Sequence, residues 1–141
     1  MRLKTELKVS NDLLKKLTTG AQVAMKKALN DSAKDGKNIA KTLILSGEKT
    51  GRIYQKYNPT RKHQASAPGE SPANDLGKLA SSVYWKRGAG LTASFGASAK
   101  YAPYLEFGTR NIAPRPFLYP AGLKINKIFK ERVRLVMQGK F

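Results

Sequence analysis

A helical repeat of apolar residues spanning residues 11–45 is the feature that most constrains the fold. Ser10 or Asn11 is placed to cap this helix. If unbroken, the helix would be about 50 Å long at a rise of about 1.5 Å per residue. The pair Asp35-Gly36 lies near its apolar face, so we expect a bend or break there. That broad face is formed by Leu13, Leu14, Leu17, Ala21, Ala24, Met25, Ala28, Leu29, Ile39 and Leu43.

Lysines gather on the opposite side of this helix. They belong to a strongly basic chain, with 27 Lys and Arg against 9 Asp and Glu and a net charge of +18. Such a charge favours polyanions, whether nucleic acid, acidic protein or a membrane surface, without choosing among them. Three interpretations of the lysines stay open: a solvated surface, contact with an acidic neighbouring protein, and contact with DNA. We call four of them the basic face: Lys26, Lys27, Lys34 and Lys37.

The segment that follows the long helix changes character. Residues 47–65 have β-branched and aromatic residues and a turn at Asn58-Pro59, so they read as a hairpin or a long loop. Residues 66–75 contain two prolines and a glycine, which favours an ordered but irregular loop. A short helix is expected from about Ala73 to Ser81, with Leu76 and Leu79 facing inward.

The remaining segments predict strands and helices around one core. Residues 1–9 favour a short strand or an arm, and residues 82–98 favour two antiparallel strands around a Gly88–Gly90 turn. Residues 101–107 suggest a short helix, and residues 117–137 a second amphipathic helix. We therefore expect an α+β fold in a single domain, residues 1–141, with the two long helices packed on a small, mainly antiparallel sheet. The apolar side of the second helix is formed by Ile125, Phe129, Val133 and Val136.

Catalytic chemistry lacks its usual residues in this sequence. There is no cysteine, which excludes disulfides, thiolate metal sites and cysteine nucleophiles, and His63 is the single histidine. Ser66 has no base nearby other than His63, and we expect Glu70 and Asp75 to serve as turn and helix-cap residues. The sequence therefore favours a protein that is not an enzyme and needs no cofactor or metal. The N-terminus lacks the apolar core of a secretory signal, and the apolar runs are too short to span a bilayer.

Two blocks of sequence carry the most specific signal: "HQASAPGESPANDLGKLASSV" (63–83) and "YAPYLEFGTRNIAPRPFLYPA" (101–121). Together they resemble the tail-completion, or head–tail joining, proteins of the neck of long-tailed bacteriophages of the siphovirus type. The resemblance covers about half of the chain, and residues 1–60 match only in general shape. In the first block, the resemblance rests on a loop motif formed by Ser66, Pro68, Gly69, Glu70 and Pro72. The second block carries it in a later motif, Tyr101, Tyr104, Glu106, Phe107, Gly108, Arg115, Pro116 and Phe117.

This resemblance implies a structural protein of the virion, assembled in the host cytoplasm as a ring in the neck, with six-fold symmetry. It implies as partners tail-terminator or tail-tube proteins and head-completion or adaptor proteins, with non-specific contact to genomic DNA in the channel as a further option and no membrane. A small basic nucleic-acid-binding protein, chromosomal or ribosomal, is the alternative. A closed ring favours the first function, and monomeric, salt-sensitive binding to duplex DNA favours the second.

In a ring, the second block would meet a neighbouring subunit through a heterologous interface. Its aromatic residues would serve as anchors, and its prolines would hold the loop extended and so lower the entropy lost on assembly. We expect Gly108 to permit a sharp turn after the short helix. The candidate anchors are Tyr101, Tyr104, Phe107, Phe117 and Tyr119, and the prolines are Pro103, Pro114, Pro116 and Pro120.

Glu106 is the one acidic residue in this aromatic block, and a buried carboxylate has to be paired or hydrogen-bonded. Arg115 is the leading candidate partner, because a guanidinium pairs with a carboxylate through two bonds. Backbone amides, of Gly108 and Thr109 or of the loop at residues 66–69, are the alternatives. A clamp within the chain is favoured over a contact between subunits, because short-range pairs usually serve the fold.

Overall fold

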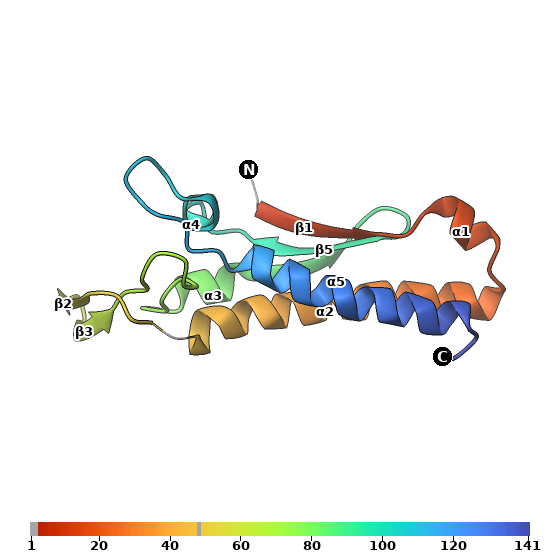
Figure 1. The fold of residues 1–141 in the computed structure, drawn as a ribbon, viewed down its shortest axis with the longest axis horizontal. Coiled ribbons are helices and arrows are strands. Elements are labelled where there is room, and N and C mark those ends of the chain that lie inside the picture. The colour runs from red at the N-terminus through yellow and green to blue at the C-terminus, as the bar shows by residue number, and fades with distance from the viewer. Residues whose placement is uncertain (1–2, 48) are drawn as a thin grey trace.

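The computed structural model describes residues 3–47 and 49–141 as an elongated α+β structure of two layers. A three-stranded sheet forms one layer, and the helices α2 and α5 lie side by side as the other (Figure 1). A separate two-stranded hairpin, β2–β3, stands at one end of the molecule, and α1 stands at the opposite end. In chain order the elements are β1 (Leu3–Lys8), α1 (Asn11–Lys15), α2 (Thr19–Ser46), β2 (Ile53–Tyr57), β3 (Thr60–Gln64), α3 (Lys78–Ser82), β4 (Val83–Arg87), β5 (Thr92–Ala97), α4 (Ala102–Phe107) and α5 (Leu118–Met137).

The sheet has the order β1-β5-β4, and both pairings are antiparallel. Phe95, on the central strand, lies opposite Thr5 on one side and Trp85 on the other, and its side chain reaches α2. Ala93 and Ala97, which share the face of Phe95 on β5, are small and buried, so the helices can approach this face of the sheet closely. Along β1 the exposed residues Lys4, Glu6 and Lys8 alternate with more buried ones, so this strand presents a charged outer side.

The core lies between the sheet and the paired helices. Its largest fully buried side chains are Phe95, Phe117, Met25, Ile44 and Ile125, which come from the sheet, from both long helices and from the residue that precedes α5. The apolar faces predicted for residues 11–45 and 117–137 therefore face this core, and the α+β class is confirmed. A polar contact crosses the helix pair beside the core, where the Arg132 guanidinium donates to Ser32 Oγ at 2.9 Å and to Asp35 Oδ2 at 2.6 Å.

The expected break at Asp35-Gly36 is wrong, because α2 continues through it. Gly36 serves packing, since a Cβ at this position would lie 2.4 Å from Cε1 of Phe95. The helix is interrupted earlier, between α1 and α2, where the Thr18 hydroxyl caps the second helix by accepting from the Ala21 amide. The side chain of Gln22 donates to two carbonyl oxygens of the interrupted turn and so satisfies them.

Two smaller predictions also need correction. The short helix starts at Lys78 rather than near Ala73, because Gly77 precedes it with a positive φ of 76°. Leu76 consequently lies outside the helix and is half exposed, whereas Leu79 is buried as expected. The predicted hairpin, irregular loop and antiparallel strand pair are confirmed, with β2–β3 turning at Asn58-Pro59.

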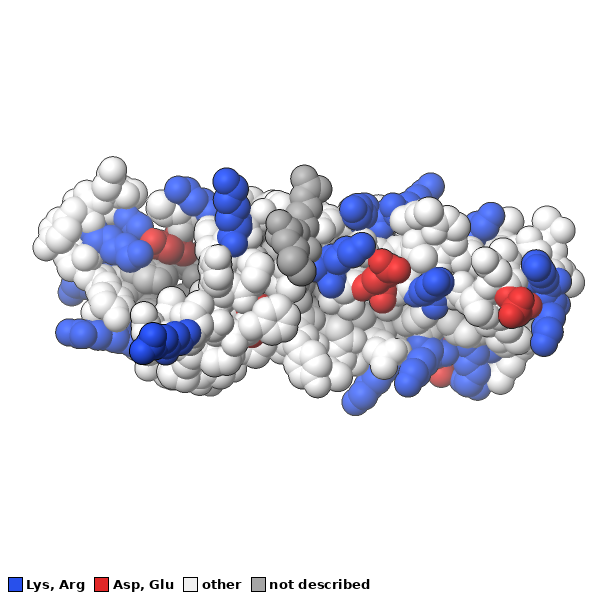
Figure 2. All heavy atoms as spheres, turned by 90° about the horizontal axis from the view of Figure 1, so that it is seen from above, with Lys and Arg blue, Asp and Glu red and all other residues white. Residues whose placement is uncertain are grey.

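On the face shown in Figure 2, basic side chains occur along the whole length of the molecule, and acidic ones are few. Among the described residues, no helix is long and apolar enough to cross a membrane. The exposed surface is therefore dominated by cations, whereas much of the acidic minority is engaged in contacts described below.

The two helical glycines Gly36 and Gly122 provide a matched test of the packing. We expect Gly36→Ala to destabilise the protein by about 1–3 kcal/mol, because the methyl group displaces the Phe95 ring. Gly122→Ala places its Cβ 3.7 Å from Thr5 Cγ2, an ordinary contact, and should stabilise α5 by about 0.5–1 kcal/mol. Chemical denaturation measures both free energies of unfolding. A stabilising Gly36→Ala would contradict this account of α2.

Candidate functional site

The carboxylate of Glu106 holds the N-terminus of α5. Its Oε2 accepts the backbone N–H groups of Phe117 and Leu118, at 2.9 and 3.0 Å, and its Oε1 accepts that of Tyr119 at 2.7 Å. The first amides of a helix have no partner within the helix, and its dipole favours a negative charge at this end. Phe117 occupies the N-cap position and has no side-chain oxygen, so Glu106 supplies the missing cap from α4.

Arg115 does not pair with Glu106, so the leading hypothesis from the sequence is wrong. Glu106 does accept from backbone amides, as the alternative predicted, but these belong to residues 117–119 rather than to the residues expected. The Arg115 guanidinium donates through Nε and Nη2 to the carbonyl oxygen of Ser66, both at 3.2 Å. The Arg115 amide donates to Leu105 O at 2.6 Å, and the Gly69 amide donates to Pro114 O at 3.0 Å. The contacts of Arg115 with Ser66, and of Pro114 with Gly69, join the two sequence blocks.

The loop motif is held by its own acidic residue. Glu70 accepts from the backbone amide and the hydroxyl of Thr50 and from the Ala67 amide. These bonds, the Thr50 hydroxyl first, hold the pKa of Glu70 below its usual range. Ser66 and Pro72 of this motif are buried, whereas Pro68 and Gly69 are exposed. The turn role expected of Glu70 therefore extends to a contact with the segment that leads into β2.

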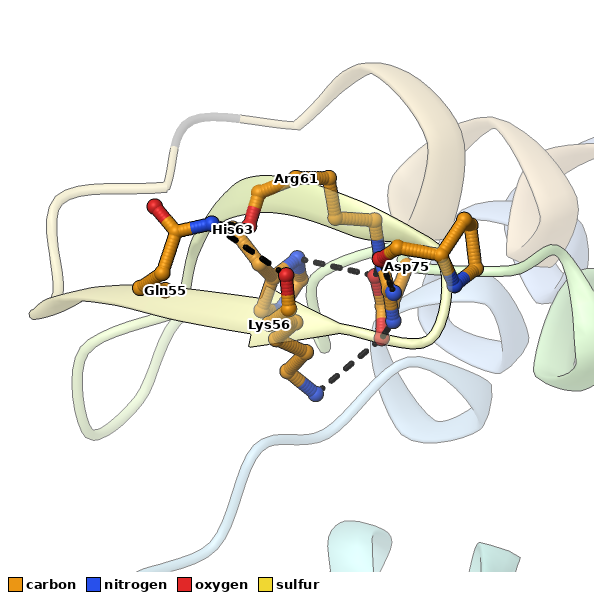
Figure 3. Close-up of polar contacts among 6 residues, drawn as sticks. Gln55, Lys56, Arg61, His63 and Asp75 are labelled. Carbon is orange, nitrogen blue, oxygen red and sulfur yellow. Dashed lines mark hydrogen bonds and ion pairs between the residues drawn. The ribbon is translucent and has the colours of Figure 1, made fainter.

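Asp75 anchors the β2–β3 hairpin (Figure 3). Its carboxylate accepts two bonds of 2.6 Å from Arg61, through Nε and Nη2, and one of 3.0 Å from Lys56 Nζ. His63 Nδ1 lies 3.6 Å from Asp75 Oδ1. The hydrogen bond from Arg61 is the main cause that lowers the pKa of Asp75 far below its usual value. The sequence analysis did not predict this cluster. A single carboxylate, Asp75, follows a predicted hairpin rich in basic residues, and that pattern could have indicated it.

Four aromatic side chains of the second block are exposed, and we call them the aromatic rim: Tyr101, Tyr104, Phe107 and Tyr119. Tyr104 and Phe107 project from the side of α4 opposite to its buried residues, with Phe107 69% exposed. Phe107 and Tyr119 line one shallow hollow beside β1, because Glu106 brings α4 to the start of α5.

The other residues of the second block serve the fold of the chain. Phe117 is fully buried, so it packs in the core of its own chain and offers no anchor to a neighbour. Gly108 ends α4 with a φ of 75°, as the predicted turn requires. Pro103 and Pro120 lie in the first turns of α4 and α5 rather than in the extended loop, which leaves Pro114 and Pro116 to stiffen it.

The basic face divides between two environments. Lys26, Lys27 and Lys34 are exposed on α2, and Lys37 is half-buried. Lys34 Nζ lies 5.0 Å from the centre of the Trp85 ring on β4, a cation–π contact. The three exposed lysines line a hollow of about 570 Å³ together with Arg87 of the β4–β5 hairpin.

Within residues 3–47 and 49–141, no group of three or more His, Asp or Glu side chains is arranged to hold a metal ion. Comparisons with protein-family models, with curated proteins and with solved structures found no match. A function therefore has to be inferred from the two sequence blocks, from the contacts that join them and from the surfaces that they leave exposed.

We expect substitutions of Glu106 to destabilise the protein, and the loss of stability should grow with the number of amides that lose their acceptor. Glu106→Ala leaves three N–H groups without their partner, at a cost of about 1–3 kcal/mol or more. Glu106→Gln keeps the shape and one acceptor oxygen, so the loss should be smaller. Urea denaturation gives the free energies, and amide hydrogen exchange at Phe117–Tyr119 locates the effect. Equal losses of stability in Glu106→Ala and Glu106→Gln would contradict the role of Glu106 as the cap of α5.

The Asp75 cluster predicts an acid-sensitive attachment of the hairpin. Because the pKa of Asp75 is lower in the folded protein than the ordinary value of about 3.9, its stabilisation is present above that value. It is lost as the pH falls toward the lowered pKa. Hydrogen exchange of residues 53–64 should therefore accelerate in acid, and Asp75→Asn should produce the fast exchange at neutral pH and remove this acid dependence.

A matched pair of cation substitutions serves as the control for this experiment. Arg61→Gln should release the hairpin more than Lys56→Gln, since Arg61 makes two bonds to Asp75 and Lys56 makes one. Unchanged exchange in Asp75→Asn would mean that other contacts hold the hairpin.

Proposed function

We propose that this protein is a structural component of the bacteriophage neck, where it joins head and tail as a subunit of a ring. The observation that carries the proposal is the direct contact between the two blocks that resemble tail-completion proteins. Arg115 of the second block binds Ser66 of the first, and Pro114 binds Gly69. The residues of the resemblance thus form one connected unit rather than two separate similarities.

The aromatic rim supports an assembly role. Protein interfaces are enriched in tyrosine, phenylalanine and arginine, and the most effective anchors are rigidly presented. Tyr104 and Phe107 are exposed on a helix whose opposite side is fixed through Glu106. Little conformational entropy would be lost when such side chains enter a pocket on a neighbour.

In this proposal the rim of one subunit meets a different surface of the next, and rotation closes a ring of six. The ring would lie between tail-terminator or tail-tube proteins and head-completion or adaptor proteins of the virion. The protein would act through these contacts and without catalysis. The alternative, a small basic nucleic-acid-binding protein, is favoured by a different observation, the cationic hollow beside α2.

The proposal predicts that the aromatic rim is needed for assembly and not for folding. Tyr104→Ser combined with Phe107→Ser should leave the melting temperature nearly unchanged, because both side chains are largely exposed. The double variant should fail to form rings in native mass spectrometry with the neighbouring neck proteins, and particles made with it should lack joined tails.

The matched control is Val23→Ser combined with Met137→Ser, two exposed apolar residues of α2 and α5 outside both blocks. This control should assemble normally. Loss of assembly in both double variants would show that the aromatic rim has no specific role in assembly. A wild-type protein that stays monomeric with its neck partners and is absent from purified particles would contradict the function itself.

A further inference from the structure

We propose that the hollow between α2 and the β4–β5 turn is a binding site for the phosphate groups of a nucleic acid backbone. The proposal concerns the isolated chain and stands independently of ring assembly. It goes beyond the basic face read from the sequence, because the hollow includes a residue of the sheet and omits Lys37.

The hollow concentrates positive charge from two elements far apart in the sequence. Lys26, Lys27 and Lys34 come from α2, and Arg87 comes from the end of β4. They face one carboxylate, Asp31, so the hollow has four cations against one anion. A concave surface lined by one sign of charge focuses the field and raises the local concentration of counter-charged groups.

These cations are available to a ligand. The ion pairs found among the described residues involve none of the four, nor Asp31. Lys34 is held over Trp85, which orients its ammonium group without neutralising its charge. The β4–β5 turn forms the other wall of the hollow and contains Gly88 and Gly90. Because Gly90 has open space where a Cβ would lie, the sugar-phosphate backbone of a nucleic acid can approach the turn closely.

The lining favours phosphates over an acidic protein segment. Protein partners are anchored mainly by apolar and aromatic side chains that fill pockets. The apolar residues of this hollow, Leu29 and Leu91, are buried in the core and offer no such pocket. Charge without an apolar pocket suits a polymer that repeats a phosphate group. The net charge of +18 adds a longer-range attraction for such a polymer.

Binding of this kind is independent of base sequence and allows sliding. A site that holds phosphates loosely is therefore compatible with DNA that moves past the protein. In a neck subunit, such a site would guide the duplex through the channel. In a chromosomal protein, it would supply non-specific affinity for DNA, so the site fits either function.

The test compares two quadruple variants that remove the same charge. The hollow variant is Lys26→Gln, Lys27→Gln, Lys34→Gln and Arg87→Gln, and the control is Lys15→Gln, Lys16→Gln, Lys127→Gln and Lys130→Gln, all exposed residues outside the hollow. Fluorescence anisotropy measures the affinity for a short mixed-sequence DNA duplex at several salt concentrations. Thermal melting checks that each variant is folded.

We expect the hollow variant to bind roughly tenfold more weakly or worse, with the slope of log affinity against log salt reduced by about 0.9 for each phosphate that the protein no longer neutralises. The control should bind only a few-fold more weakly. Asp31→Asn should bind several-fold more tightly than the wild type, because it removes the one carboxylate of the hollow. This gain cannot arise from a damaged fold, so it tests the site even if the quadruple variant unfolds.

Equal weakening in the two quadruple variants would overturn the proposal, because attraction would then be spread over the whole surface. Unchanged or weaker binding by Asp31→Asn would overturn it too. Displacement of the duplex by poly-glutamate at matched charge concentration would assign the hollow to an acidic protein partner instead. None of these outcomes depends on ring formation, so they are distinguishable from a failure of the neck function.

Discussion

The hydrogen bonds from three backbone amides to one buried carboxylate, Glu106, determine how the second half of the chain is arranged. A buried charge is costly unless it is fully hydrogen-bonded, and here both carboxylate oxygens are occupied. The cap fixes where α5 begins and therefore the direction in which α5 runs along α2. It also fixes α4, so the exposed aromatic side chains on α4 are held relative to the core.

The same use of scarce acidic residues recurs elsewhere in this strongly basic chain. Glu70 joins the loop motif to Thr50, Asp75 joins the loop after it to the hairpin, and Asp35 joins α2 to Arg132 of α5. Each contact connects segments distant in the sequence. These carboxylates hold parts of the chain together, whereas most of the Lys and Arg side chains of the described residues are exposed.

The pattern of the sequence predicted the helical regions, the hairpin and the antiparallel strands, because periodicity reports burial directly. It did not predict the interruption between α1 and α2. It failed where the outcome depended on distant partners. Gly36 looked like a helix break, and only the position of Phe95 explains it as a packing site. Reasoning from the sequence paired Glu106 with Arg115, a guanidinium of the same block, rather than with amides whose position depends on the start of α5. Sequence identifies which groups need partners, and the fold decides which partners they have.

The net charge of +18 sets the conditions under which the two proposed surfaces can operate. Copies of so basic a chain repel one another, and this repulsion is screened as salt rises. In the two proposals, contacts made by the aromatic rim would depend on apolar burial and gain from that screening, whereas phosphate binding in the hollow would weaken as salt rises. A polyanion in the hollow would neutralise part of the charge and so reduce the repulsion between neighbouring subunits. Nucleic acid and ring assembly would then reinforce each other, although they use separate surfaces of the chain.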